Sequence, residues 1–266
     1  MLFYKTHHLS PEAPWIVFIH GAGGSSDAWQ HQWEHFKNHF NLMAMDLRDH
    51  GKSKNILPEK KRYSFRLISR DIIAVLDNAG IHKAHFITLS FGSVLMQDLS
   101  KRKPGLVASA TMAGGIFKGN IWIKGFVHFA RLLNIFLTYP QMYRLFSKIL
   151  MPKKRHQLSR RVYQIYARQL TSEEYLKWLG LYSTFFLTLK RFYEQTIHFP
   201  ALVVMGADDY VFLQAAKDFS EKHKKVELAI IKQAGHICNI DQPDKFNYTV
   251  HQFLKSQDPK PKFQIA

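Results

Sequence analysis

The segment Thr88-Leu89-Ser90-Phe91-Gly92 places a serine hydroxyl between an expected strand and an expected helix. A sharp turn of this kind holds a nucleophile above the edge of a sheet, and small residues two positions away let strand and helix approach. Gly92 meets that need, whereas Thr88 stands where a small glycine is usual. Serine is also a common helix N-cap, so a purely structural role for Ser90 is the alternative interpretation.

Four other loops that leave apolar segments carry residues able to assist a nucleophile. They are His20-Gly21-Ala22-Gly23-Gly24, Asp46-Leu47-Arg48-Asp49-His50-Gly51-Lys52-Ser53, Gly206-Ala207-Asp208-Asp209 and Gly235-His236. The carboxyl ends of parallel strands meet at one edge of an open α/β sheet, where such sheets bind ligands. Histidine is the base best matched to neutral pH, and a carboxylate fixes its tautomer. The spacing from Gly206 favours Asp209 as that carboxylate over its neighbour Asp208.

Short apolar runs alternate with amphipathic stretches along most of the chain. The expected strands are residues 15–19, 42–45, 84–89, 107–112, 201–205 and 226–231, and the expected helices are 27–40, 64–78, 91–101, 212–223 and 243–255. Strands that alternate with helices predict an α/β fold with a mainly parallel sheet covered on both faces. Residues 116–196 break this rhythm, because their pattern predicts helices only.

The motifs and their order resemble a lid-bearing α/β-hydrolase of the serine esterase or lipase type. The resemblance covers nearly all of the chain except residues 112–196. It implies an α/β-hydrolase core of residues 1–111 and 197–266, with residues 112–196 as a helical cap, or lid. One loop departs from the family, because Asp49 stands where the pattern Arg-Gly-His-Gly has its first glycine.

The resemblance also implies roles for individual residues. Ser90 falls on the nucleophile, Asp209 on the acid and His236 on the base. The backbone N–H groups of Phe91 and Ala22 fall on the oxyanion hole, which stabilises the negative charge that develops on the substrate oxygen.

These roles predict a serine hydrolase that cleaves carboxylic esters through an acyl-enzyme. Aromatic side chains of the expected cap suggest an acyl or aromatic pocket, and we expect it to include Trp122, Phe126, Phe129 and Phe185. The same triad also serves carbon–carbon bond hydrolases, perhydrolases, thioesterases and some lyases, and a non-catalytic binding protein on this fold is a further alternative. Epoxide hydrolases and haloalkane dehalogenases are disfavoured, because a serine occupies the position of their aspartate nucleophile.

The chain is strongly basic, with a formal net charge of +17. Residues 112–196 hold 14 Lys and Arg against 3 Asp and Glu, so +11 of that charge lies in the expected cap. The cluster Lys153-Lys154-Arg155 with Arg160-Arg161 suits an anionic membrane surface, although a solvated helix face explains it equally well. No nucleic-acid-binding motif accompanies the charge, and no apolar stretch is long enough to span a bilayer.

The remaining features predict a cytoplasmic protein without a cofactor or a metal. A single cysteine suits a reducing compartment, and the first eight residues do not resemble a signal peptide. The 15 histidines are scattered and no carboxylate cluster accompanies them, which disfavours a metal site. Cys238 is expected to be a small buried side chain rather than a reactive thiol.

Overall fold

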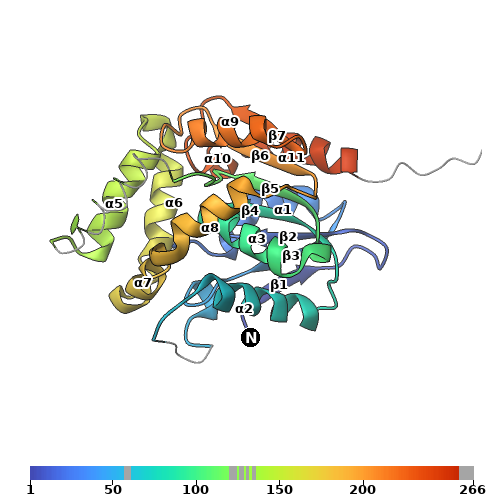
Figure 1. Ribbon diagram of the computed structural model, residues 1–266, viewed down its shortest axis with the longest axis horizontal. Coiled ribbons are helices and arrows are strands. Elements are labelled where there is room, and N and C mark those ends of the chain that lie inside the picture. Colours follow the sequence, from blue (N-terminus) through green and yellow to red (C-terminus); the bar gives the residue numbers. More distant parts are fainter. Residues whose placement is uncertain (57–60, 120–124, 126–128, 130–131, 134–135, 258–266) are drawn as a thin grey trace, which may run out of the picture.

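The computed structural model describes residues 1–56, 61–119, 125, 129, 132–133 and 136–257, and its strands form one sheet (Figure 1). The strands are β1 (Tyr4–His7), β2 (Trp15–Ile19), β3 (Asn41–Met45), β4 (Ala84–Leu89), β5 (Val107–Ala113), β6 (Ala201–Gly206) and β7 (Val226–Ile231). Their order across the sheet is β1-β3-β2-β4-β5-β6-β7. All neighbours are parallel except β1 and β3, so the expected mainly parallel sheet is confirmed.

The edge strand β1 is the one that the apolar pattern does not predict. Three of its residues are half-buried and Thr6 is exposed, and Lys5 and His7 interrupt any apolar run. It joins the sheet through antiparallel pairing with β3 alone, in a register that sets Tyr4 opposite Met45. The six parallel strands, by contrast, begin and end within one residue of the expected ranges.

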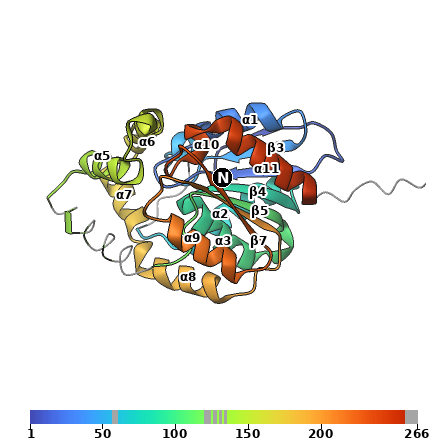
Figure 2. The ribbon, with the colours of Figure 1, turned by 90° about the horizontal axis from the view of Figure 1, so that it is seen from above.

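Helices cover both faces of the sheet (Figure 2). Those of the regular α/β pattern are α1 (Gln30–Phe36), α2 (Phe65–Asn78), α3 (Phe91–Arg102), α9 (Leu213–Lys222), α10 (Cys238–Asp241) and α11 (Pro243–Gln257), with 3₁₀ turns η1 (Ser26–Trp29), η2 (Gly51–Ser53) and η3 (Pro104–Leu106). Figure 2 shows α1 and α11 on one face and α2, α3 and α9 on the other. Each face of the parallel strands is therefore shielded from water, which explains their unbroken apolar runs.

Helix α2 illustrates how the sequence sets these elements. The Ser64 hydroxyl accepts a hydrogen bond from the backbone N–H of Leu67 and so caps the first turn. The side chains that face the core recur at helical spacing. They are Phe65, Ile68, Ile72, Val75 and Leu76. Gly80 follows with a positive φ of 66°, a conformation that glycine adopts without steric cost and that ends the helix.

Further helices lie between β5 and β6 in the sequence. They are α5 (Tyr139–Leu150), the 3₁₀ turn η4 (Lys154–His156), α6 (Gln157–Ala167), α7 (Ser172–Leu179) and α8 (Tyr182–Glu194), called the inserted helices below. Figures 1 and 2 both show α5, α6 and α7 together at one end of the molecule. The division of the chain at residues 112 and 196 into core and cap stays a prediction.

Candidate active site

Ser90 occupies a strained turn between β4 and α3. Its φ of 51° and ψ of −118° lie in a region that L-residues rarely adopt. Such a conformation costs of order 1–3 kcal/mol and persists only where surrounding structure enforces it. Here the Ser90 N–H donates to the carbonyl of Ala113 at 2.8 Å, and α3 packs so closely that a Cβ on Gly92 would lie 2.7 Å from the carbonyl oxygen of Ile19.

Thr88 departs from the usual small residue without disturbing this turn. Its side chain is fully buried, and its hydroxyl donates to the carbonyl of Thr111 on β5 at 3.2 Å. The extra polar atom is therefore satisfied inside the sheet, where an unpaired hydroxyl would be costly.

The side chains of Ser90, His236 and Asp209 form one chain of close contacts. The Nε2 atom of His236 lies 2.8 Å from Ser90 Oγ, and its Nδ1 atom lies 2.7 Å from Asp209 Oδ2. The other carboxylate oxygen of Asp209 accepts the backbone N–H of Phe212 at 3.1 Å. His236 and Asp209 are buried, so water does not compete for these contacts. This arrangement lets His236 take the Ser90 proton while a carboxylate faces the resulting imidazolium.

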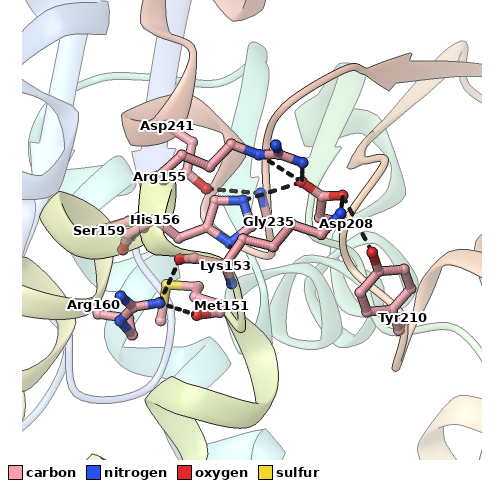
Figure 3. Close-up of polar contacts among 10 residues, drawn as sticks. All are labelled: Met151, Lys153, Arg155, His156, Ser159, Arg160, Asp208, Tyr210, Gly235 and Asp241. Atoms are coloured by element: carbon pink, nitrogen blue, oxygen red, sulfur yellow. Dashed lines mark hydrogen bonds and ion pairs between the residues drawn. The ribbon is translucent and has the colours of Figure 1, made fainter.

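The neighbouring Asp208 faces Lys153, Arg155 and His156 of the inserted helices (Figure 3). Its carboxylate lies 3.1 Å from Lys153 Nζ and 3.0 Å from Arg155 Nε, and it also accepts a hydrogen bond from the Tyr210 hydroxyl. Of the two adjacent aspartates, only Asp209 is therefore placed beside the imidazole.

Two apolar cavities meet at Ser90 and His236. One has a volume of about 60 Å³ and the other about 110 Å³, and Ala22, Leu150 and Tyr163 also line both. The larger cavity is further lined by Phe91, Ile116, Phe146, Tyr175, Leu179, Tyr182, Phe185 and Phe212. Ala22 and Phe91, the two expected oxyanion-hole residues, thus lie at the same cavity as the Ser90 hydroxyl.

The aromatic residues expected to bind substrate are divided by the structure. Phe185 lines the larger cavity and stacks on Phe91, with ring centroids 6.1 Å apart. Phe129 is 53% exposed and lines neither cavity, while Trp122 and Phe126 lie outside the described residues. Leu150 and Tyr163, which line both cavities, were not predicted from the sequence. No sequence pattern separates them from the many other aromatic and aliphatic residues of this region.

Two histidines that the sequence analysis assigned no role hold the loop that contains Ala22. His50 Nε2 accepts the Gly23 N–H at 3.0 Å, and His20 Nε2 accepts the Leu47 N–H at 2.9 Å. Both Nδ1 atoms face backbone carbonyl oxygens at 2.7 Å, which requires neutral rings. Burial and the nearby His20 lower the pKa of His50 to about 3, and burial lowers the pKa of His20 as well. The one sequence feature that could have indicated this role is that His20 and His50 each directly precede a glycine in their loops.

Asp49 shows why its position holds glycine in the related loop pattern. Its φ is 63°, and its carboxylate accepts the Tyr63 hydroxyl at 2.5 Å. Burial raises the pKa of Asp49 despite that hydrogen bond. Aspartate tolerates the left-handed region better than most residues, so this substitution keeps the loop geometry.

Burial decides the protonation state of the Cys238 thiol. Cys238 is fully buried and burial raises the pKa of its thiol, which keeps it neutral. The described residues contain no group of three or more His, Cys, Asp or Glu side chains that could hold a metal ion.

The comparisons with known proteins agree with this fold. A sequence profile of the alpha/beta hydrolase fold matches residues 14–243. RutD of Agrobacterium fabrum, provisionally named a carbamate hydrolase, is 24% identical over 259 residues, which cover 93% of this chain and 95% of RutD. The 3-oxoadipate enol-lactonase 1 of Acinetobacter baylyi is 26% identical and covers 92% of this chain and 90% of its own.

Solved structures share the fold at low sequence identity. A thermophilic esterase from Thermogutta terrifontis superposes with a TM-score of 0.78 at 14% identity, over 97% of this chain and 94% of that one. Because the profile spans most of the sequence and the sheet has the matching architecture, this chain belongs to the alpha/beta hydrolase fold family.

Proposed function

We propose that this α/β hydrolase cleaves carboxylic esters whose groups beside the scissile bond are uncharged and apolar. The observation that carries the proposal is the chain of contacts from Ser90 Oγ through His236 to Asp209, with distances of 2.8 and 2.7 Å, at the junction of two apolar cavities.

The proposed reaction follows from these positions. His236 Nε2 takes the proton of Ser90 as its oxygen attacks the ester carbonyl, and Asp209 stabilises the imidazolium. The N–H groups of Ala22 and Phe91 face the oxyanion, where each donor is worth about 2.7–4 kcal/mol. The imidazolium then protonates the departing alcohol. Water attacks the acyl-enzyme with His236 again as base, which releases the acid and restores Ser90.

The lining of the cavities supports an uncharged substrate. Among the described residues, neither cavity is lined by Lys, Arg, Asp or Glu. A substrate carboxylate placed there would lose its hydration without gaining an ion pair, which is costly. The two cavities give separate space for the acyl and alcohol groups on either side of Ser90.

A panel of substrates tests the proposal. We expect acyl esters of graded chain length to be hydrolysed faster than carboxylate-bearing lactones, carbamates and thioesters of similar size. Ser90→Ala is expected to fold and to lower kcat about 10⁴- to 10⁶-fold, because the nucleophile is lost while binding and the oxyanion hole remain. Covalent labelling by a fluorophosphonate probe provides the second measurement. Ester turnover by Ser90→Ala at the wild-type rate would contradict the assignment.

A peripheral contact with an anionic membrane surface is also proposed, on the exposed face of α6. Leu158, Arg161 and Ile165 follow one another at helical spacing, and all three are exposed. Exposed apolar and basic side chains on one helix face suit the interface of an anionic bilayer. No helix in the described part of the chain is long and apolar enough to cross that bilayer.

A further inference from the structure

The segment that precedes α6 reaches both loops that carry the acid and the base of the proposed triad (Figure 3). His156 is fully buried, and its Nε2 atom lies 3.2 Å from Asp208 Oδ2, without the alignment of a full hydrogen bond. Its ring rests on the backbone of Gly235, where an added Cβ would lie 3.1 Å from His156 Nδ1. Asp208 directly precedes Asp209, and Gly235 directly precedes His236.

The polar groups around His156 fix its tautomer and the charge of its neighbour. The Lys153 N–H points at His156 Nδ1 at 3.4 Å, which leaves the ring proton on Nε2, facing Asp208. Burial opposes ionisation of Asp208, but hydrogen bonds from Arg155 and Lys153 outweigh it and hold the pKa of that carboxyl below its usual range. The carboxylate that faces His156 is therefore ionised at neutral pH.

Backbone hydrogen bonds join the same three segments. The N–H of Asp208 donates to the carbonyl of Ala234 at 2.9 Å, which links the loop that carries Asp209 to the loop that carries His236. The N–H of His236 donates to the carbonyl of Leu150 at the end of α5, at 3.3 Å. A shift of the segment between α5 and α6 would thus act directly on the loop that holds the catalytic imidazole.

We propose that His156 and Asp208 are positioning residues that hold Asp209 and His236 at the separation the triad needs. The inference rests on the proposed hydrolase function and extends it to the inserted helices. Helix α6 begins directly after His156, and three of its side chains line the cavities beside Ser90. They are Val162, Tyr163 and Tyr166. A substrate that packs against this wall keeps α6, and with it His156, in the position that aligns the triad.

The test uses kcat, KM and the rate of fluorophosphonate labelling in variants at both positions. Asp208→Asn and His156→Leu are each expected to lower kcat and the labelling rate about 10- to 100-fold, because small misplacements of reacting groups have effects of that size. KM for a short ester changes less than twofold, because neither side chain is among the described residues that line the two cavities beside Ser90. His156→Gln retains an N–H donor at a similar reach and keeps more activity than His156→Leu. The double variant loses no more than the worse single variant, because both changes break one contact.

Asp98→Asn is the matched control. Asp98 is similarly buried and pairs with Arg102 through both carboxylate oxygens, but it lies two helical turns beyond Ser90 on α3. The kcat of Asp98→Asn is expected to stay within twofold of the wild-type value. Circular dichroism establishes whether each variant is folded. If Asp208→Asn does not fold, the proposal is tested by the kcat of the two His156 variants, where His156→Gln must exceed His156→Leu. If the wild type hydrolyses the ester and folded variants match it, the positioning role is overturned. If the wild type itself neither turns over nor labels, the proposed function fails first.

Discussion

In the loop after β6, the adjacent residues Asp208 and Asp209 have different surroundings. Asp209 is enclosed with His236, while Asp208 faces two cations and His156 of the inserted helices. The chain turns here, with the Asp209 N–H donating to the Gly206 carbonyl at 3.1 Å, and in this turn the two neighbouring carboxylates face different partners. Their substitution should therefore have effects of different size.

Asp209→Asn is expected to lower kcat about 10⁴-fold, because an amide no longer favours the imidazole tautomer with a free Nε2 lone pair. Asp208→Asn should also lower kcat, but by a factor at least ten times smaller, since the asparagine lies away from the imidazole. Steady-state assays with one soluble ester compare the two variants. The acid would have to be reassigned to Asp208 if the order of the two values were reversed.

His50 gives the free energy of unfolding a pH dependence. Its pKa is about 3 in the folded protein, against 6.5 without burial. Between these values the unfolded chain binds a proton that the folded protein does not, so stability falls as pH decreases from about 6.5 toward 3. The slope is up to about 1.4 kcal/mol per pH unit for one such group.

His50→Gln should flatten this slope, because glutamine can still accept the Gly23 N–H but takes up no proton. Urea unfolding at pH 7.5 and pH 5 measures the difference. His82→Gln is the control, since His82 is exposed. Equal pH dependence in wild type and His50→Gln would show that the ring is not held neutral by the fold.

Helix α3 begins one residue after Ser90, the proposed nucleophile, and its close approach to β2 sets where Ser90 lies. Gly92→Ala would place a Cβ 2.7 Å from the carbonyl oxygen of Ile19 and 2.8 Å from that of His20. Neither backbone oxygen can move aside as a side chain could. We expect the variant to lose about 1–3 kcal/mol of unfolding free energy, as overpacked sites do.

Gly105→Ala serves as the control, because a Cβ there would have no atom within 4 Å. Urea unfolding compares both variants, and the labelling rate reports whether Ser90 has moved. A Gly92→Ala protein as stable as Gly105→Ala would mean that α3 can shift without cost.

The elements that the sequence predicts best are those whose signal is local. Buried parallel strands such as Trp15–Ile19 are continuous apolar runs, and the order Ser90, Asp209, His236 gives the proposed triad once the strands are known. The strand β1 has no such run, because pairing with β3 rather than burial makes it a strand. The contact of His156 with Asp208 joins residues far apart in the sequence. No local pattern encodes a contact of that kind, and the aromatic residues of the inserted helices divide into lining and exposed positions only in three dimensions.

Part of the basic cluster of the inserted helices binds groups within the protein. Lys153 and Arg155 pair with Asp208, and Arg160 donates to the carbonyls of Met151 and Lys153 at 2.5 and 2.6 Å (Figure 3). These three cations are therefore poor positions at which to test membrane contact. Lys154 and Arg161 are exposed and leave that internal network intact when they are changed.

Lys154→Glu combined with Arg161→Glu is expected to lower the affinity for anionic vesicles, measured by co-sedimentation, at least about 30-fold. Each basic residue lost removes about 1 kcal/mol of binding free energy. Salt should release the wild type, because the attraction is screened. Lys245→Glu with Lys255→Glu makes the same change in net charge on α11 and should bind like wild type. Equal binding to neutral and anionic vesicles, or binding to neither, would contradict the membrane contact and show that the basic side chains of α6 only interact with water.

The position of the inserted helices in the chain has a consequence for biosynthesis. The strands β1 to β5 and Ser90 leave the ribosome first, whereas β6 and β7, which bring Asp209 and His236, follow only after α8. Chains fold from the N-terminus as they are made. A nascent chain therefore carries a serine hydroxyl with no base beside it, and a hydroxyl alone is a weak nucleophile. The proposed reactivity toward acyl groups needs β6 and β7 as well, so chains that end before His236 are expected to lack it.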